Sequence, residues 1–404
     1  MRRIMGRCLG MIHQLKVIII KIFLIVAGLF PAHNKLMVFE SFSGKQYSCN
    51  PRAIYEYMVK YHPEYIMYWC VDRKCRDHFT NKNLKIIERY SLKWLFILGF
   101  SKFWVINSRM PLTIVKPRHT IYIQTWHGTP LKKLGFDVKE VHIPKTTTAK
   151  YQASSYKETC LWDYLVSPNN YSSETFKRAF GFEKEILEYG YPRNDVLYTH
   201  NTPEYIESIK QKLGIPLDKK VILYAPTWRD NQFYEVEHYK FDLPLDLRAL
   251  QERYQDQYVI LLRMHSLVGE NFDLSPYTGF AYDFSIGIDV NELYLVADLL
   301  ITDYSSVFFD YANLRRPIIF YMYDIEEYRD VLRGFYFDIE RAAPGPIAKN
   351  MSELLDVIEK FNQQGEFPDY FDSYQAFYEQ YCYLESGNST KKVVQNTIFK
   401  NRSY

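Results

Sequence analysis

The stretch IYIQTWHGTP, residues 121–130, begins with a short apolar run and ends in a polar loop that contains a histidine, a glycine and a proline. A short apolar run that is bounded by turn residues is typical of a buried strand in a parallel sheet. His127 then lies just beyond the carboxyl end of that strand. Ligands bind at this edge of open α/β sheets, so the same stretch bears on both the fold and the function.

Four other polar clusters follow apolar runs in the same way. They are GYPRND (190–195) after 186–189, APTWRD (225–230) after 221–224, RMHS (263–266) after 258–262, and TDYSS (302–306) after 299–301. Because the carboxyl ends of parallel strands meet at one edge of a sheet, we expect all five clusters to converge on a single cleft.

Apolar runs and helical segments alternate along the chain in two series, which a connecting helix at 201–218 separates. This order predicts an α/β protein with two Rossmann-like domains that face each other across a cleft. The helices near the C-terminus have no strands between them, so we expect them to pack back across both domains. The predicted boundaries are 35–200 for the first domain, 201–350 for the second and 351–404 for the C-terminal helices.

Residues 1–34 form a basic and apolar N-terminal segment. Its apolar run VIIIKIFLIVAGLF (17–30) contains Lys21 and is shorter than the roughly 20 residues that a spanning helix needs. No small-x-small cleavage site of a secretory signal precedes Pro31. Two interpretations remain: a helix that lies in the cytoplasmic interface of a membrane, or a helix buried on its own first domain. Both place the chain in the cytoplasm, the first as a peripheral protein at the membrane face.

The composition excludes several classes of protein. Of the 404 residues, 47% are hydrophobic and 24% are charged, which is typical of a globular chain. The net charge of +3 gives no bulk attraction to nucleic acid, so no nucleic-acid partner is expected. The six cysteines form no CxxC pair and fit a reduced compartment. Neither a G-x-G-x-x-G nor a Walker A motif occurs, which favours a nucleotide-diphosphate donor over NAD or ATP.

The serines of TDYSS stand at a predicted strand-to-helix junction. Ser305 and Ser306 would cap the helix there, and its free N–H groups would form an anion site. Asp310 lies one turn further along, on the side of Ser306, and would reach a hydroxyl of the ligand. An ordinary N-cap is the alternative.

The remaining clusters supply cations and two imidazoles. His265 would contact or stabilise a phosphate, while an arginine such as Arg263 more often supports its loop. Arg193 and Arg229 add planar cations that suit phosphate, although a single such arginine is usually a structural ion pair. His127 is a candidate general base, because the pKa of histidine lies near working pH. A packed turn residue is the alternative; a metal ligand would need companions, and no HxxxH or HxH occurs.

Several motifs together resemble the CDP-glycerol glycerophosphotransferase family, which includes the wall teichoic acid primases and polymerases of Gram-positive bacteria. They are WHGTPLKKLG, SPNNYSSETFKRAFGF (167–182), GYPRND, YAPTWRD, RMH and the run 298–317, in collinear order. The resemblance implies a GT-B fold, with 35–200 as the acceptor domain and 201–350 as the CDP-donor domain. It also implies a membrane-associated enzyme with a lipid-linked acceptor.

The resemblance also assigns roles to residues. His127 would be the base toward the acceptor hydroxyl, and His265 a second essential imidazole near the donor's pyrophosphate. The donor-binding positions would be His127, Gly128, Thr129, Pro130, Leu131, Arg193, Pro226, Thr227, Arg263, Met264, His265, Ser305, Ser306 and Asp310. No metal-ligand set and no cofactor is required by the sequence, and a loosely bound divalent cation on the pyrophosphate stays open.

The predicted reaction transfers glycerol phosphate from CDP-glycerol to a hydroxyl and releases CMP. The acceptor would be an undecaprenyl-diphosphate-linked saccharide, for a primase, or a glycerol-phosphate acceptor, for a polymerase. The alternatives are a CDP-ribitol ribitolphosphotransferase, a GT-B glycosyltransferase for a surface polysaccharide, and a non-catalytic membrane-bound scaffold. The sequence does not indicate the oligomeric state.

Overall fold

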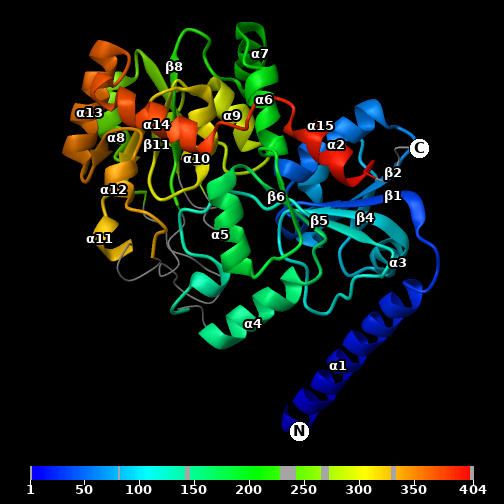
Figure 1. Ribbon diagram of the computed structural model, residues 1–404. Coiled ribbons are helices and arrows are strands. Elements are labelled where there is room, and N and C mark those ends of the chain that lie inside the picture. Colours follow the sequence, from blue (N-terminus) through cyan, green and yellow to red (C-terminus); the bar gives the residue numbers. More distant parts are fainter. Residues whose placement is uncertain are drawn as a thin grey trace.

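The computed structural model describes residues 2–80, 82–141, 146–227, 243–264, 273–328 and 334–400. Two sheets, in each of which all strand pairs are parallel, form the centre of the molecule, and helices surround them (Figure 1). The first sheet has the order β3-β2-β1-β4-β5-β6-β7 and the second β10-β9-β8-β11-β12-β13. The predicted α/β class is therefore confirmed, with one sheet from each series of strands.

The strands of the first sheet are β1 (His33–Glu40), β2 (Ile66–Val71), β3 (Ile86–Glu88), β4 (Ser101–Ile106), β5 (Ile121–Gln124), β6 (Tyr164–Ser167) and β7 (Glu185–Glu188). Those of the second sheet are β8 (Lys220–Ala225), β9 (Tyr258–Leu262), β10 (Ala281–Asp283), β11 (Leu299–Thr302), β12 (Ile318–Tyr321) and β13 (Ile347–Ala348).

The uninterrupted apolar runs of the second sheet follow from burial on both of its faces. Side chains alternate along a strand, so Val221 and Leu223 of β8 belong to one core while Ile222 and Tyr224 belong to another. Helices that cover both faces of a parallel sheet remove the need for polar residues at alternate positions.

Helices connect the strands in both halves. They are α2 (Cys49–Tyr61), α3 (Leu92–Phe100), α4 (Thr148–Thr159) and α5 (Asn170–Phe180) in the first half, and α8 (Leu247–Tyr254), α9 (Val290–Val296), α10 (Val307–Tyr311) and α13 (Met351–Gln364) in the second. The side chain of Asn169 caps α5, and Asp246 caps α8.

The segment between the two sheets contains η4 (Pro192–Asn194), α6 (Asp195–Thr199) and α7 (Pro203–Leu213). α7 lies inside the predicted connecting helix. Thr202 caps its start, and Gly214 ends it with φ +68°, a conformation that favours glycine.

The C-terminal helices α14 (Phe371–Tyr381) and α15 (Ser389–Thr397) pack against both halves. Phe377 and Tyr381 of α14 enter a core of the second sheet, whereas Val393 and Val394 of α15 enter a core of the first. α15 also lies beside α2 and η4 (Figure 1). The C-terminal segment therefore ties the two halves together.

The N-terminal helix α1 (Arg2–Ala27) projects from the body of the protein (Figure 1). In its last turns Leu24 and Ala27 are buried, and Phe23 contacts Phe100 of α3. The apolar side chains that remain exposed on this helix include Leu15, Ile18, Ile19, Ile22, Ile25 and Val26. Within the ranges described above, no helix has the length and apolar character needed to cross a membrane.

Candidate active site

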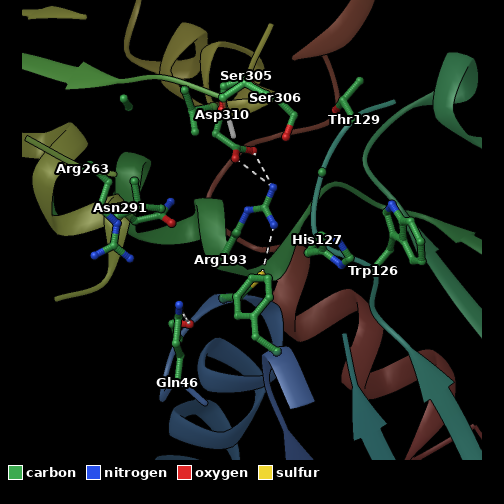
Figure 2. Close-up of a pocket in the computed structure, with 18 of the residues that line it drawn as sticks. Gln46, Trp126, His127, Thr129, Arg193, Arg263, Asn291, Ser305, Ser306 and Asp310 are labelled. Atoms are coloured by element: carbon green, nitrogen blue, oxygen red, sulfur yellow. Dashed lines mark hydrogen bonds and ion pairs between the residues drawn. The ribbon is translucent and has the colours of Figure 1, made fainter. Parts of the chain in front are cut away.

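A pocket of about 690 Å³ lies between the two sheets, and residues from both halves line it (Figure 2). All five strand-end clusters contribute to it, which confirms their predicted convergence. The predicted donor-site residues that line it are His127, Gly128, Thr129, Pro130, Leu131, Arg193, Pro226, Thr227, Arg263, Met264, Ser305, Ser306 and Asp310. His265 and Arg229 lie outside the described residues.

A backbone carbonyl orients the imidazole of His127. Its Nδ1 lies 2.6 Å from the carbonyl oxygen of Asn107. A carbonyl oxygen only accepts, so Nδ1 carries the proton and the lone pair of the neutral ring is on Nε2. This tautomer is the one that a general base needs, and the side chain is partly exposed in the pocket.

Two aromatic rings pack against the imidazole. Trp126 stacks on His127 with ring centroids 4.6 Å apart, and Phe42 meets it edge-on at 5.5 Å. Both aromatic residues have positive φ, +50° and +47°, which is rare for bulky side chains and costs about 1–3 kcal/mol each. Their backbone N–H groups donate to side-chain oxygens, Trp126 to Gln124 (3.0 Å) and Phe42 to Asn107 (2.8 Å). The backbone is therefore strained at the two residues whose rings pack against the imidazole.

Asn107 connects these features, and our sequence analysis missed it. Its backbone oxygen orients His127, while its side-chain Oδ1 fixes Phe42. Asn107 directly follows β4, and it is a polar residue at the end of the apolar run FWVI. Its position directly after a strand was the sequence signal for a site residue, because each of the five clusters also directly follows an apolar run.

The loop that follows His127 touches the second half of the molecule. A Cβ atom on Gly128 would lie 2.7 Å from Oγ of Ser306, so a larger residue here would require the Ser306 side chain or the loop to shift. Tyr191 donates from its hydroxyl to the carbonyl oxygen of Gly128 at 3.0 Å. Ser306 occupies the N-cap position of α10, but its side chain makes no capping hydrogen bond there. The Ser306 hydroxyl instead lies against the loop.

Arg193 and Asp310 form a buried ion pair across the two halves (Figure 2). Nη2 of Arg193 donates to both carboxylate oxygens of Asp310, at 2.8 and 3.0 Å, and Nη1 donates to Sγ of Cys49 at 3.1 Å. Arg193 is 7% exposed and Asp310 5%. Asn194 adds a hydrogen bond to the same carboxylate at 3.0 Å. Both groups line the pocket, as predicted, and they also engage each other, which is the ion-pair alternative stated for the arginine; contact with a ligand stays a prediction.

Arg263 lies on another side of the pocket from His127 (Figure 2). Its Nη1 donates to the carbonyl oxygen of Phe284, so it supports the loop after β9, as expected. Burial lowers the pKa of Arg263, and the nearby carboxylate of Asp289 opposes this effect. The neighbouring Met264 N–H donates to Oγ of Ser285 at 3.0 Å. In the described part of the chain, no three His, Cys, Asp or Glu side chains form a group that could hold a metal ion.

Comparison with known proteins identifies the family. Residues 22–400 match the family model described as CDP-Glycerol:Poly(glycerophosphate) glycerophosphotransferase. The chain belongs to this family. The family predicted from the sequence motifs is therefore confirmed, and with it the predicted class of enzyme.

Relatives within this glycerophosphotransferase family are similar over most of the chain. The teichoic acid poly(glycerol phosphate) polymerase of Bacillus subtilis (strain 168) is 57% identical over 93% of this chain, which spans 50% of that relative. The polymerase of the same name from Bacillus spizizenii is 52% identical over 92% of this chain and 94% of its own length. A solved structure of the wall teichoic acid polymerase TagF superposes with a TM-score of 0.86 at 42% identity, covering 99% of this chain and 97% of that one.

Proposed function

We propose that this chain transfers glycerol phosphate from CDP-glycerol to a hydroxyl of a teichoic acid acceptor and releases CMP, as a poly(glycerol phosphate) polymerase. The observation that carries the proposal is the orientation of His127, whose Nδ1–H is held by a backbone carbonyl so that Nε2 has the lone pair. The names of the two relatives above 50% identity favour a polymerase over a primase.

In the proposed reaction, the acceptor hydroxyl gives its proton to Nε2 of His127 while its oxygen attacks the phosphorus that carries glycerol. The bond from this phosphorus to the bridging oxygen breaks, and CMP leaves with the electron pair. Hydroxyl groups of Ser305 and Ser306, both partly exposed at the pocket wall, are suited to contact the phosphate oxygens. His265 keeps its proposed role as a second imidazole near the pyrophosphate.

The proposal includes a GT-B arrangement, with residues 35–200 as the Rossmann-like acceptor domain, 201–350 as the Rossmann-like CDP-donor domain and 351–404 crossing back. In its support, the strands of the second sheet fall inside 201–350, and those of the first fall inside 35–200 except that β1 begins at His33. The pocket has lining residues from both ranges.

We further propose that residues 1–34 dock on the cytoplasmic face of the membrane, where an undecaprenyl-diphosphate-linked acceptor would be anchored. The exposed apolar side chains of α1 support this, because such residues gain free energy on entering the headgroup boundary. A vesicle flotation assay with and without residues 1–30 tests the point. Equal flotation of the two proteins would contradict it.

No resident cofactor is part of the proposal. In the alternative version of the proposal, a loosely bound divalent cation contacts the donor's pyrophosphate. Turnover in excess EDTA, with and without restored Mg²⁺, separates the two forms.

The decisive experiment incubates the protein with radiolabelled CDP-glycerol and a lipid-linked disaccharide that carries one glycerol phosphate. The proposal predicts CMP release and products that contain many added units. Release of a nucleoside diphosphate would indicate glycosyl transfer, and turnover with CDP-ribitol alone would exclude the glycerol donor. Transfer that stops after a single unit would indicate a primase.

A further inference from the structure

A second cavity of about 520 Å³ adjoins the pocket of His127. Its walls come from the loop after β1, from the segment 72–82 with η2 (Arg73–Phe79), and from the loop 285–288 before α9. The residues that line both cavities are Lys45, Gln46, Ser48, Arg263 and Ser285. The two cavities therefore meet along a common edge.

This common edge lies across the first pocket from the imidazole of His127. Phe42 contacts His127, and Lys45 follows only three residues later in the chain. Three residues span at most about 11 Å, so the backbone of Lys45 lies within that distance of Phe42. Figure 2 shows Gln46 and Arg263 on the other sides of the pocket from His127. A chain whose end reaches His127 can thus continue into the second cavity.

Positive charge dominates the lining of the second cavity. Three lysines, Lys45, Lys74 and Lys82, line it together with Arg263, whereas Asp72 is the one acidic residue in the described lining. The Asp72 carboxylate already accepts a hydrogen bond from the backbone N–H of Lys74 at 2.9 Å. Within the part of the chain that the structure describes, none of the three lysines forms an ion pair.

The Lys82 ammonium is partly shielded from solvent. It lies 5.0 Å from the centre of the Tyr47 ring and is only partly exposed. Burial lowers the pKa of Lys82, and the positive charge of Arg52 lowers it further. An anion in the cavity would relieve both effects, because it stabilises the charged form of the lysine.

The Tyr47 ring in this cavity is already engaged by other side chains and is not placed to stack on a nucleobase. Tyr47, the one tyrosine in its described lining, already contacts Lys82 and also Arg52, whose guanidinium carbon lies 5.3 Å from the ring centre. The same ring packs edge-on against Trp69 at 4.8 Å. Flexible lysines act as point charges and suit a series of phosphates better than one planar group.

We propose that the second cavity binds internal phosphodiesters of the growing poly(glycerol phosphate) chain, behind the terminal hydroxyl that His127 activates. The inference rests on the proposed polymerase function and assigns a place to the anionic part of its acceptor. Lys45 and Arg263 contact the phosphate at the common edge, and Lys74 and Lys82 contact those behind it. An acceptor with several units is therefore bound more tightly than an acceptor with one.

The test compares two acceptors with the double variant K74Q/K82Q, since both lysines line the second cavity and not the first. Both acceptors contain the same lipid diphosphate and disaccharide; one bears a single glycerol phosphate and the other bears several. For the longer acceptor we expect KM to rise about tenfold and to lose roughly half of its salt dependence, because two of the four proposed cations are removed. The KM for CDP-glycerol and for the short acceptor should change by less than about twofold.

The matched control is K157Q/K360Q, which removes two exposed lysines from α4 and α13 that line neither cavity. It should retain the wild-type KM for both acceptors. Equal thermal unfolding midpoints of the two double variants would show that K74Q/K82Q is folded.

Three outcomes would overturn the inference while the proposed function stands. The first is an unchanged KM for the longer acceptor, and the second is an equal rise for both acceptors, which would place the lipid diphosphate in the cavity. The third is a raised KM for CDP-glycerol, which would make the cavity part of the donor site. If wild-type protein releases no CMP from CDP-glycerol with either acceptor, the proposed function fails and the inference fails with it.

Discussion

His127 and Arg193 line the same pocket, but the structure uses them differently. The imidazole is partly exposed, held by one backbone carbonyl and packed between two aromatic rings. The guanidinium is 7% exposed and engages Asp310 through two hydrogen bonds. The guanidinium is thus engaged by a carboxylate within the protein, whereas the proposed role of the imidazole is in the reaction. Chemical character alone, a cation or an imidazole in a strand-end cluster, does not separate the two arrangements.

The largest expected effect is on turnover. His127→Ala should lower kcat by about 10²- to 10⁴-fold, the range for loss of a general base, because the variant lacks the imidazole that would take the hydroxyl proton. The free energy of unfolding should stay close to the wild-type value, since the side chain is not fully buried. Steady-state CMP release and urea unfolding measure the two quantities. A variant that retains more than about a tenth of kcat would contradict the role of His127.

The next effect is on stability and concerns the ion pair. Arg193→Met should lower the free energy of unfolding by about 3–5 kcal/mol, because the carboxylate of Asp310 is left buried without its partner. The double variant R193M/D310L should recover much of this loss, since it removes both charges. Urea unfolding of the wild type and the three variants provides the comparison. If the single variant loses less than about 1 kcal/mol, the pair does not join the halves as described.

A smaller effect tests the contact between the loop and the second half. Gly128→Ala should lower the free energy of unfolding by about 1–3 kcal/mol, because its Cβ would lie 2.7 Å from Oγ of Ser306. Ser306→Ala removes that oxygen, so the double variant should lose less than the sum of the two single variants. A strictly additive double-mutant cycle would show that the two residues do not touch.

The last effect appears only as a change with pH and involves Glu385, which Asn194 links to Asp310 of the ion pair. Burial raises the pKa of Glu385 to about 8 from its ordinary value of 4.5, although the Tyr191 N–H and the Asn194 amide oppose this by hydrogen bonding to it. The native state therefore keeps a proton that the unfolded state loses, and this contribution to stability falls as pH rises from about 4.5 to about 8.

The side chain in the Glu385→Gln variant cannot ionise, so the stability of this variant should not fall in that pH range through this position. Relative to wild type, its free energy of unfolding should increase by up to about 1.4 kcal/mol per pH unit between about pH 5 and 8. Urea unfolding at a series of pH values measures the difference. A difference that does not vary with pH would mean that Glu385 ionises normally in the native protein.

Local patterns in the sequence predicted most of the architecture. Apolar runs predicted the strands other than the short β10 and β13. The rule that ligands bind at strand ends brought five separate clusters to one pocket, including both His127 and Ser306. These predictions need only the order of residues, because the period of the pattern and the position of each strand end are local properties.

Contacts between distant segments were not predictable in this way. Arg193 and Asp310 are 117 positions apart, and nothing local distinguishes a cation that meets a ligand from one that meets a carboxylate. The positive φ of Phe42 and Trp126 likewise comes from tertiary packing around His127, which overrides the local preference of bulky residues. Asn107 orients the imidazole through its backbone oxygen. Its polar side chain at the end of β4 marks the position, but the side-chain pattern does not reveal what a backbone group does.

The most direct test of the central claim measures binding and turnover on one preparation of His127→Ala. If the imidazole activates the acceptor hydroxyl and does not hold the donor, CDP-glycerol should bind with a Kd within about threefold of wild type while CMP release is nearly abolished. Calorimetric titration of CDP-glycerol into the variant gives the Kd. Loss of donor binding in parallel with turnover would contradict the account, as would turnover close to that of the wild type.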